Sequence, residues 1–349
     1  GDAYDHSIFM SYKVINRSNK DYHDTYIGVF TDFDIGYAHD DYIGCNVENG
    51  YFYAYNGDDY DTYYRDTIPV QANVILSGPF MNEDNLDNPS GLCDEGINGS
   101  GFGDGIVDNE RMGLNRFVYF NNQGSSATTD PHSAIDYYNY MKGIWKDGTS
   151  ILYGGNGHVS SGAWGPETRF VFPGESDPCN WGTNGLEPNN DEIWTEENVS
   201  NQPEDRRGLA SMGPFTFEAG STEYIDLVLV TAPYTDEKSN IELMENFVSE
   251  IKQDYLQNPM GFGDQYVGIN ETDKILEGIN IYPNPTSGEV IHLEINEYTS
   301  YTIHSLSGQL LFQGSIESRE INISKLNKGI YIFNIHTPNK TYTSKLIKL

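Results

Sequence analysis

Apolar and polar residues alternate over short stretches from the start of the chain to about residue 235, and clusters of Gly, Asn, Asp and Pro separate the stretches. The stretches that we expect to form strands are 7–15, 25–31, 50–55, 74–76, 117–120, 169–172, 215–217 and 224–231. A period of two residues is typical of a strand with one buried face. Short strands with frequent turn signals favour a β-sandwich over a parallel α/β sheet. We therefore predict an all-β fold, with a jelly-roll-like sandwich in this part.

Two segments have a helical pattern instead. Asp130 followed by Pro131 offers an N-cap and a first helical residue, and apolar residues then recur at helical spacing. Ser239 with Glu242 forms a capping-box pattern before a second apolar series, which Pro259 ends. The loops at 80–116 and 173–207 are long, and loops of that size are usually functional or held in place by something such as an ion.

The segment from 279 to 349 has a different texture. Apolar residues alternate with polar ones at 291–295, turn residues follow 301–305 and 335, and the stretch 329–335 is apolar on both faces, as in a central strand. We predict a small Ig-like β-sandwich of about seven short strands here.

The charge distribution divides the chain in the same way. The 349 residues include 52 Asp and Glu against 20 Lys and Arg, but from Lys274 onward seven basic and six acidic residues nearly cancel. The preceding part therefore carries a net charge of −33. We expect an acidic body at 1–257, a linker at 258–278 and a C-terminal domain at 279–349. So few basic residues exclude a nucleic-acid partner and an anionic membrane surface for the body.

Ordered motifs in the C-terminal segment carry a resemblance. The residues are Tyr282, Pro283, Asn284, Pro285 and Gly288; Gly308 after Ser307; Gly329 and Tyr331 within 326–331; and the terminal Lys345, Leu346, Ile347, Lys348 and Leu349. Together they resemble the type A C-terminal sorting domain of cargo proteins of the Bacteroidetes type IX secretion system. The resemblance implies export across the outer membrane to the cell surface or the extracellular space. It also implies three partners: an outer-membrane translocon, a shuttle β-barrel and a surface sortase.

The body is similar, more loosely, to uncharacterised acidic modules found upstream of such sorting domains. The residues that carry this likeness lie at 31–36, 40–45, 55–58, 103–110, 172–178, 205–207 and 213–216. No run approaches the ~18 apolar residues of a membrane span, so we expect no direct membrane insertion. Because a strand-like pattern begins almost at Gly1, we interpret the chain as lacking an upstream portion.

Acidic clusters in the body suggest a metal. The candidate ligands are Asp32 and Asp34 on one side of a strand, Asp40 and Asp41 in the next loop, and Asp58, Asp59 and Asp61. Groups of hard oxygen donors suit Ca²⁺, which takes six to eight such ligands. The alternative is a solvated acidic surface.

The body also contains the only cysteines of the chain, Cys45, Cys93 and Cys179. They allow at most one disulfide, with three pairings open.

Enzyme signatures are missing: there is no HExxH, no GxSxG and no phosphate-binding glycine loop. We therefore assign no catalytic residue. Tyr51, Tyr53 and Tyr55 could stack on sugars, although packing in the sheet is the favoured interpretation. Our hypothesis is a binding or adhesion module, with a glycan ligand and calcium. The alternatives are an extracellular hydrolase with an unrecognised catalytic part, and a structural surface-layer or gliding component.

Overall fold

A computed structural model describes residues 2–91, 93, 98–122, 126–188, 193–233, 239–257, 280–294, 300–306, 308–316, 319–337 and 341–349. The chain forms two compact units, Gly1–Tyr266 and Val267–Leu349. We call the first unit the body and the second the sorting unit. The linker expected at 258–278 lies outside the described residues.

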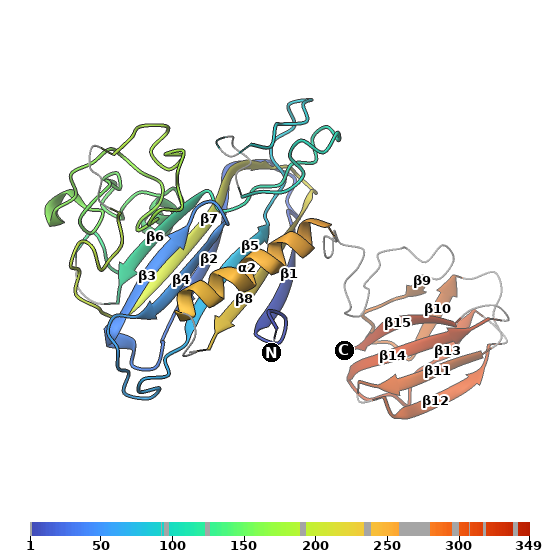
Figure 1. Ribbon diagram of the computed structural model, residues 1–349. Coiled ribbons are helices and arrows are strands. Elements are labelled where there is room, and N and C mark those ends of the chain that lie inside the picture. Colours follow the sequence, from blue (N-terminus) through green and yellow to red (C-terminus); the bar gives the residue numbers. More distant parts are fainter. Residues whose placement is uncertain are drawn as a thin grey trace. The chain divides into compact units, whose positions relative to one another are not determined.

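The body contains two antiparallel sheets (Figure 1). The larger sheet has the order β1-β8-β5-β4-β3 and is formed by β1 (Ser7–Ile15), β3 (Asp41–Asn46), β4 (Tyr51–Asn56), β5 (Val70–Ser77) and β8 (Thr222–Ala232). The smaller sheet has the order β2-β7-β6 and is formed by β2 (Tyr22–Asp32), β6 (Arg116–Asn121) and β7 (Arg206–Phe217). The pairings are nested, because β1 pairs with β8 in one sheet and β2 with β7 in the other. This nesting is the jelly-roll-like arrangement that the strand pattern predicts.

The main core of the body lies between these two sheets. Ile43 and Phe52 from the larger sheet and Phe117 and Ala210 from the smaller one are fully buried in it. A Cβ at Gly208 on β7 would lie 2.8 Å from the Phe52 ring, so a larger residue does not fit there. The sheets are therefore packed closely enough to require a glycine at this crossing.

Helix α2 (Asn240–Gln257) covers the outer face of the larger sheet, where it contacts β5 and β8 (Figure 1). It begins after Ser239, whose Oγ accepts a hydrogen bond of 3.1 Å from the backbone N–H of Glu242. The apolar side of the helix packs on buried side chains of the sheet, among them Tyr51 and Tyr55. The second predicted helix is confirmed, and these tyrosines are packing residues.

The first predicted helix starts later than expected. Helix α1 spans Ala134–Met141, and its N-cap is Ser133, which forms a capping box with Asp136. Asp130 does not cap it, because both carboxylate oxygens of Asp130 accept hydrogen bonds from the Arg207 side chain. Two single-turn 3-10 helices, Ala38–Asp40 and Val159–Ser161, complete the helical elements of the described residues.

The strand prediction fails at two places in the body. Residues 169–172 form only an isolated parallel bridge, between Phe170 and Phe117. Conversely, the pattern misses β3, because its residues Asp41–Asn46 include two polar side chains and Gly44 and show no alternation, although all but Asn46 are buried. A Cβ at Gly44 would meet the Tyr53 ring on β4 at 3.0 Å, so the glycine makes room for that tyrosine.

The sorting unit is a sandwich of a three-stranded and a four-stranded antiparallel sheet. The first consists of β9 (Asn280–Tyr282), β10 (Val290–Glu294) and β13 (Glu320–Asn322); the second consists of β11 (Ser300–Ser305), β12 (Leu310–Ser315), β14 (Gly329–His336) and β15 (Thr341–Lys348). Ile291, Leu293, Phe333 and Leu346 are fully buried between them. The stretch that is apolar on both faces is β14, which lies between β11 and β15 as predicted. No described helix is long and apolar enough to cross a membrane.

Candidate functional site

The first motif of the sorting unit is fastened to the last strand. The Asn284 side chain donates to the carbonyl of Lys345 at 2.6 Å and accepts from the N–H of Ile347 at 2.9 Å. Thr286 continues this contact through its backbone, donating to the carbonyl of Ile347 and accepting from the N–H of Leu349. The segment 284–286 therefore lies beside the end of β15 like a short extra strand.

The other motifs meet at the same end of the four-stranded sheet. The register places Gly329 opposite Lys348 and Tyr331 opposite Ser305, the last residue of β11. Gly308 follows in the turn after β11, where its φ of +83° is one that glycine adopts without strain. Four motifs that are far apart in sequence thus form one continuous surface.

Much of this motif surface is exposed to solvent. Pro283, Asn284, Pro285, Gly288, Gly308, Lys345 and Leu349 are exposed, and Tyr282 keeps 45% of its surface accessible while it stacks on His292. Thr286, Leu326 and Leu346 anchor the region in the interior. The described residues of this surface are loop ends and basic side chains, among which no cluster of catalytic groups occurs.

The seven aspartates that the sequence suggests as metal ligands separate into three environments in the body. In the first environment, one carboxylate oxygen from each of Asp32, Asp34 and Asp205 lies within 4.8 Å of the other two. Arg207 forms ion pairs with two members of this trio, because its Nε lies 3.1 Å from Oδ1 of Asp32 and 3.6 Å from Oδ1 of Asp205. Burial, together with the neighbouring Asp32 and Asp205, raises the pKa of Asp34.

Asp40 and Asp41 lie at the start of β3. Asp41 is buried, with 1% of its surface accessible, and its Oδ2 accepts a hydrogen bond of 3.0 Å from the N–H of Ile35. Burial raises the pKa of Asp41 to about 8, and burial followed by the charges of Asp61 and Asp58 raises that of Asp40 to about 6. Carboxylates in this environment are poorly compensated.

The last three candidates serve the loop after β4. Asp61 is fully buried and accepts hydrogen bonds from the N–H groups of Tyr37, Tyr63 and Tyr64. Burial alone raises the pKa of Asp61, but these donors outweigh burial and the net shift is downward. Asp58 accepts from the N–H of Tyr60, and Asp59 is exposed. Asp61 is thus explained as a structural residue of the loop.

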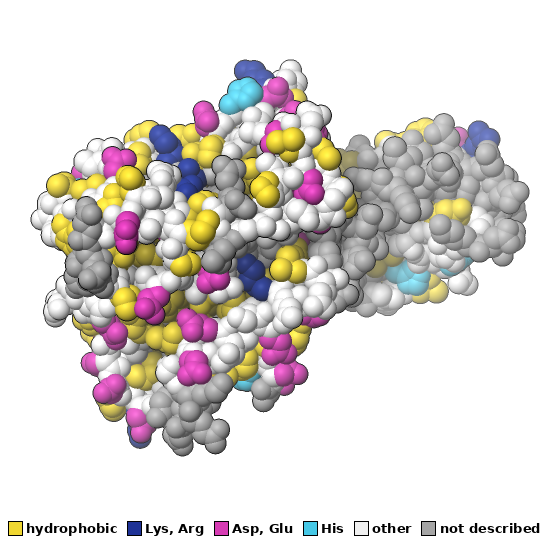
Figure 2. Space-filling view, turned by 45° about the horizontal axis from the view of Figure 1, so that its top comes forward, with side chains coloured by type: hydrophobic (Ala, Val, Ile, Leu, Met, Phe, Trp, Pro, Cys, Tyr) yellow, Lys and Arg dark blue, Asp and Glu magenta, His cyan; other side chains and the backbone are white. Residues whose placement is uncertain are grey.

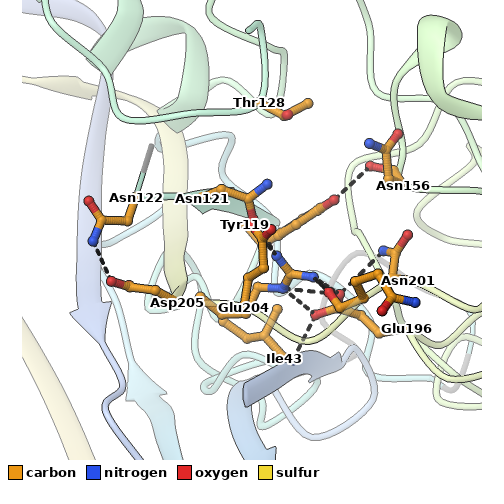
Figure 3. Close-up of polar contacts among 12 residues, drawn as sticks. Ile43, Tyr119, Asn121, Asn122, Thr128, Asn156, Glu196, Asn201, Glu204 and Asp205 are labelled. Carbon is orange, nitrogen blue, oxygen red and sulfur yellow. Dashed lines mark hydrogen bonds and ion pairs between the residues drawn. The ribbon is translucent and has the colours of Figure 1, made fainter. Parts of the chain in front are cut away.

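A buried ion pair holds the long loop that ends at β7 (Figure 3). The Arg206 guanidinium on β7 donates to both carboxylate oxygens of Glu196, with a shortest distance of 2.8 Å. The remaining capacity of Glu196 is filled by the N–H of Ile43 on β3 and by the side chain of Asn201. Burial lowers the pKa of Arg206, but Glu196, Tyr119 and Glu204 together raise it by more, and the net shift is upward. The pair is fully satisfied, and it connects the loop to both sheets.

A cationic cleft of about 630 Å³ lies beside the long loops of the body. Its lining consists of Met81, Cys93, Phe102, Met112, Asn115, Arg116, Arg169, Cys179, Trp181, Asn184, Gly185, Gly213 and Pro214. Two of these residues are arginines and none is acidic. The contrast with the rest of the body is large, because acidic side chains are spread over the face seen in Figure 2 while Lys and Arg lie at few places on it.

Both arginines of the cationic cleft are held in fixed positions. The Arg169 guanidinium lies 4.6 Å from the centre of the Trp181 ring and donates to the carbonyl of Trp181. Arg116 donates from Nε to the carbonyl of Lys142 at 2.9 Å and from Nη1 to that of Gly213, and its guanidinium lies over Tyr26. Sequence reasoning missed this site, because the residues come from four distant segments and no motif joins them.

The cysteines form one disulfide in the body. Cys93 pairs with Cys179, which joins the two long loops beside the cationic cleft, and Cys45 is a buried free thiol on β3. Burial raises the pKa of the Cys45 thiol, so it is a poor nucleophile.

Comparison with known proteins distinguishes the two units. No curated protein matches the chain. Of the solved structures that match, PorZ, a surface component of the type IX secretion system of Porphyromonas gingivalis, is 22% identical over 21% of this chain and 12% of its own, with a TM-score of 0.19. A polysaccharide lyase is 8% identical over 98% of this chain and 32% of its own, with a TM-score of 0.27. The chain spans about a third or less of these structures, and neither likeness carries an argument about the body.

The sorting unit, in contrast, matches the model of a known protein family. Residues 280–349 match the secretion system C-terminal sorting domain, and the match covers all seven strands of the unit together with the motif surface. The sequence resemblance is thereby confirmed. The chain is a cargo protein of the type IX secretion system, exported across the outer membrane to the cell surface or the extracellular space.

Proposed function

We propose that the body is a binding module for adhesion, which the sorting unit delivers to the cell exterior, and that its ligand is an acidic glycan. The observation that supports the proposal is the cationic cleft, whose described lining contains two oriented arginines and no acidic residue, although the chain before Lys274 carries a net charge of −33. A guanidinium recognises a carboxylate or sulfate in a planar, two-bond geometry.

The rest of the lining suits a sugar. Trp181 and Phe102 provide apolar ring surface, and Asn115 and Asn184 provide amide donors and acceptors for hydroxyl groups. Because Trp181 fixes Arg169 by stacking, a bound anion orders few additional groups, and the entropic cost of binding is low.

The hydrolase alternative receives no support from this cleft. Hydrolysis of a glycosidic bond usually needs two carboxyl groups on either side of the bond. The carboxylates in the described part of the body lie outside the lining, and the buried Glu196 is fully engaged by Arg206, Ile43 and Asn201.

The test is a glycan array that contains uronate-rich, sulfated and neutral oligosaccharides, probed with the full chain and two variants. Asn184 is exposed at the rim, so Asn184→Asp adds a carboxylate to the cationic cleft without removing a buried contact. We expect about tenfold weaker binding of acidic glycans, which corresponds to ~1.4 kcal/mol. The matched control is Asn19→Asp, on the exposed turn after β1, with unchanged binding. Equal binding of acidic and neutral glycans, or equal effects of both variants, would contradict the proposal.

A further inference from the structure

A buried carboxylate oxygen without a hydrogen-bond donor lies where β3 begins. Asp41 points to the same side of its strand as Ile43 and Cys45, which belong to the core between the two sheets. Its Oδ2 has a partner in the N–H of Ile35, but its buried Oδ1 has none. An ionised oxygen left in this state costs several kcal/mol unless a cation, a proton or water compensates it.

Two further buried oxygens without a donor belong to residues next to Asp41, one in the register of the sheet and one in sequence. Asn56 is directly opposite Asp41 in the register of β3 and β4, so the two side chains share one face at a Cβ separation of ~5 Å. The Asn56 amide nitrogen is committed to Asp58, while its Oδ1 is buried without a donor. The Oδ1 of the adjacent Asp40 is likewise buried and without a donor.

No basic side chain compensates these oxygens. In the part of the chain that the structure describes, neither Asp40 nor Asp41 forms an ion pair with Lys or Arg. In the neighbouring trio of Asp32, Asp34 and Asp205, Arg207 supplies a positive charge, although the buried Oδ1 of Asp205 also lacks a hydrogen-bond donor. A guanidinium therefore lies at the trio, whereas no Lys or Arg among the described residues pairs with the carboxylates at the start of β3.

We propose that Asp40, Asp41 and Asn56 form a Ca²⁺ site, with one side-chain Oδ1 from each residue as ligand. Three hard oxygens without any nitrogen or sulfur ligand favour Ca²⁺ over a transition metal. A ligand set of this size leaves positions for water, which Ca²⁺ accepts in flexible geometry. The site narrows the seven aspartates suggested by the sequence to two and adds an asparagine.

The ion would have a structural effect on the loop before β7. The carbonyl of Asp41 accepts a hydrogen bond of 3.2 Å from the N–H of Glu204, and Gly57, next to Asn56, approaches Pro203 so closely that a Cβ would lie 2.5 Å from its ring. An ion between β3 and β4 thus fixes the surface on which residues 203–204 rest. The site shares no residue with the cationic cleft, so its failure and that of the proposed function are separate outcomes.

The test is a calcium titration of the EDTA-treated full chain, in which isothermal calorimetry measures the affinity and thermal melting measures the stability. We expect one Ca²⁺ per chain with a higher melting temperature, and at least tenfold weaker binding for Asp41→Asn, which keeps the shape and an acceptor for Ile35. The matched control is Asp34→Asn in the trio, with unchanged affinity. Should Asp41→Asn fail to fold, Asn56→Ala provides the same readout at the more accessible ligand. No heat of binding, an equal response to Mg²⁺, or loss of binding in Asp34→Asn alone would overturn the assignment.

Discussion

The body and the sorting unit hold their irregular segments by different means. In the body, buried charged side chains connect loops to strands, as in Glu196 with Arg206 and in Arg111 with Asp226, whose side chains are at most 4% exposed. In the described part of the sorting unit, the buried residues are apolar apart from Thr286, and the first motif is held by hydrogen bonds of the β type.

The difference relates to what each unit presents. Removing one partner of a buried ion pair strongly destabilises a protein, because the other charge is left uncompensated in the interior. It can therefore fix a long loop in one geometry, which a ligand cleft between loops requires. The motif surface of the sorting unit is instead an extension of a sheet, and single substitutions there weaken it gradually. The following predictions examine this contrast, from the largest expected effect to the smallest.

Breaking the Glu196–Arg206 pair is expected to have the largest effect. Glu196→Gln removes the buried carboxylate from Arg206 and leaves only the exposed Glu204, 3.8 Å away, as a charged partner, and we expect a loss of ~3–5 kcal/mol in the free energy of unfolding of the body. Urea denaturation followed by tryptophan fluorescence measures it, since all four tryptophans lie in the body. Arg207→Met is the comparison, because its partners Asp32 and Asp130 are partly exposed and its contact with the less exposed Asp205 is long, at 3.6 Å; its loss should cost ~1 kcal/mol. A loss below 1 kcal/mol in Glu196→Gln would remove the distinction between the units.

Opening the disulfide should affect the body alone. The Cys93–Cys179 bond closes a segment of 86 residues, and a double Cys→Ser variant should lose ~2–4 kcal/mol in the free energy of unfolding. Because the sorting unit contains no cysteine, a reducing agent should lower only the melting transition of the body in calorimetry. Cys45→Ala controls for the loss of a thiol. A transition of the sorting unit that moves with reductant would contradict the account.

Removing the Asn284 side chain should weaken the motif surface moderately. Asn284→Ala loses the two hydrogen bonds to β15, and because the site is exposed we expect a cost of ~1–2 kcal/mol. The fraction of protein secreted by cells should fall, while the melting transition of the body within the full chain stays unchanged. Asn327→Ala is the matched control, because the exposed Asn327 contacts Tyr331 only through its backbone carbonyl. Equal secretion of the two variants would contradict a role of the Asn284 hydrogen bonds in holding the motif surface.

A further prediction, outside this ranking, is a pH dependence at helix α2. The Lys252 amine donates to the carbonyls of Asn49 and Asn98, and burial lowers its pKa to about 8. The unfolded chain keeps that proton up to its ordinary pKa of ~10.4, so the unfolded state binds more protons between the two values. The stability of the body should therefore gain from this group as the pH rises from 8 to 10. Melting curves of Lys252→Met should lack that gain, and an unchanged slope would refute the shift.

The sequence alone predicts elements well and partners poorly. The bounds of β1, the helix after Ser239 and the central strand of the sorting unit follow from local period and capping, which need no knowledge of the rest of the fold. In contrast, Asp32 meets Arg207 because the β2–β7 register places them opposite each other, 175 residues apart in sequence. Asp41 and Asn56 are closer together in sequence, but their pairing depends on β3, a strand that the sequence pattern misses because Gly44 interrupts it. Long-range register thus determines which charges are compensated.

The most direct test of the central claim, that the body binds an acidic glycan in its cationic cleft, compares two forms of one ligand. A uronate oligosaccharide and its carboxyl-reduced counterpart differ only in charge, and isothermal calorimetry with the full chain gives the affinity for each. The account predicts measurable binding of the uronate form, weaker in Arg169→Gln and unchanged in Arg17→Gln on the exposed turn after β1. Binding of both forms with the same affinity would contradict it.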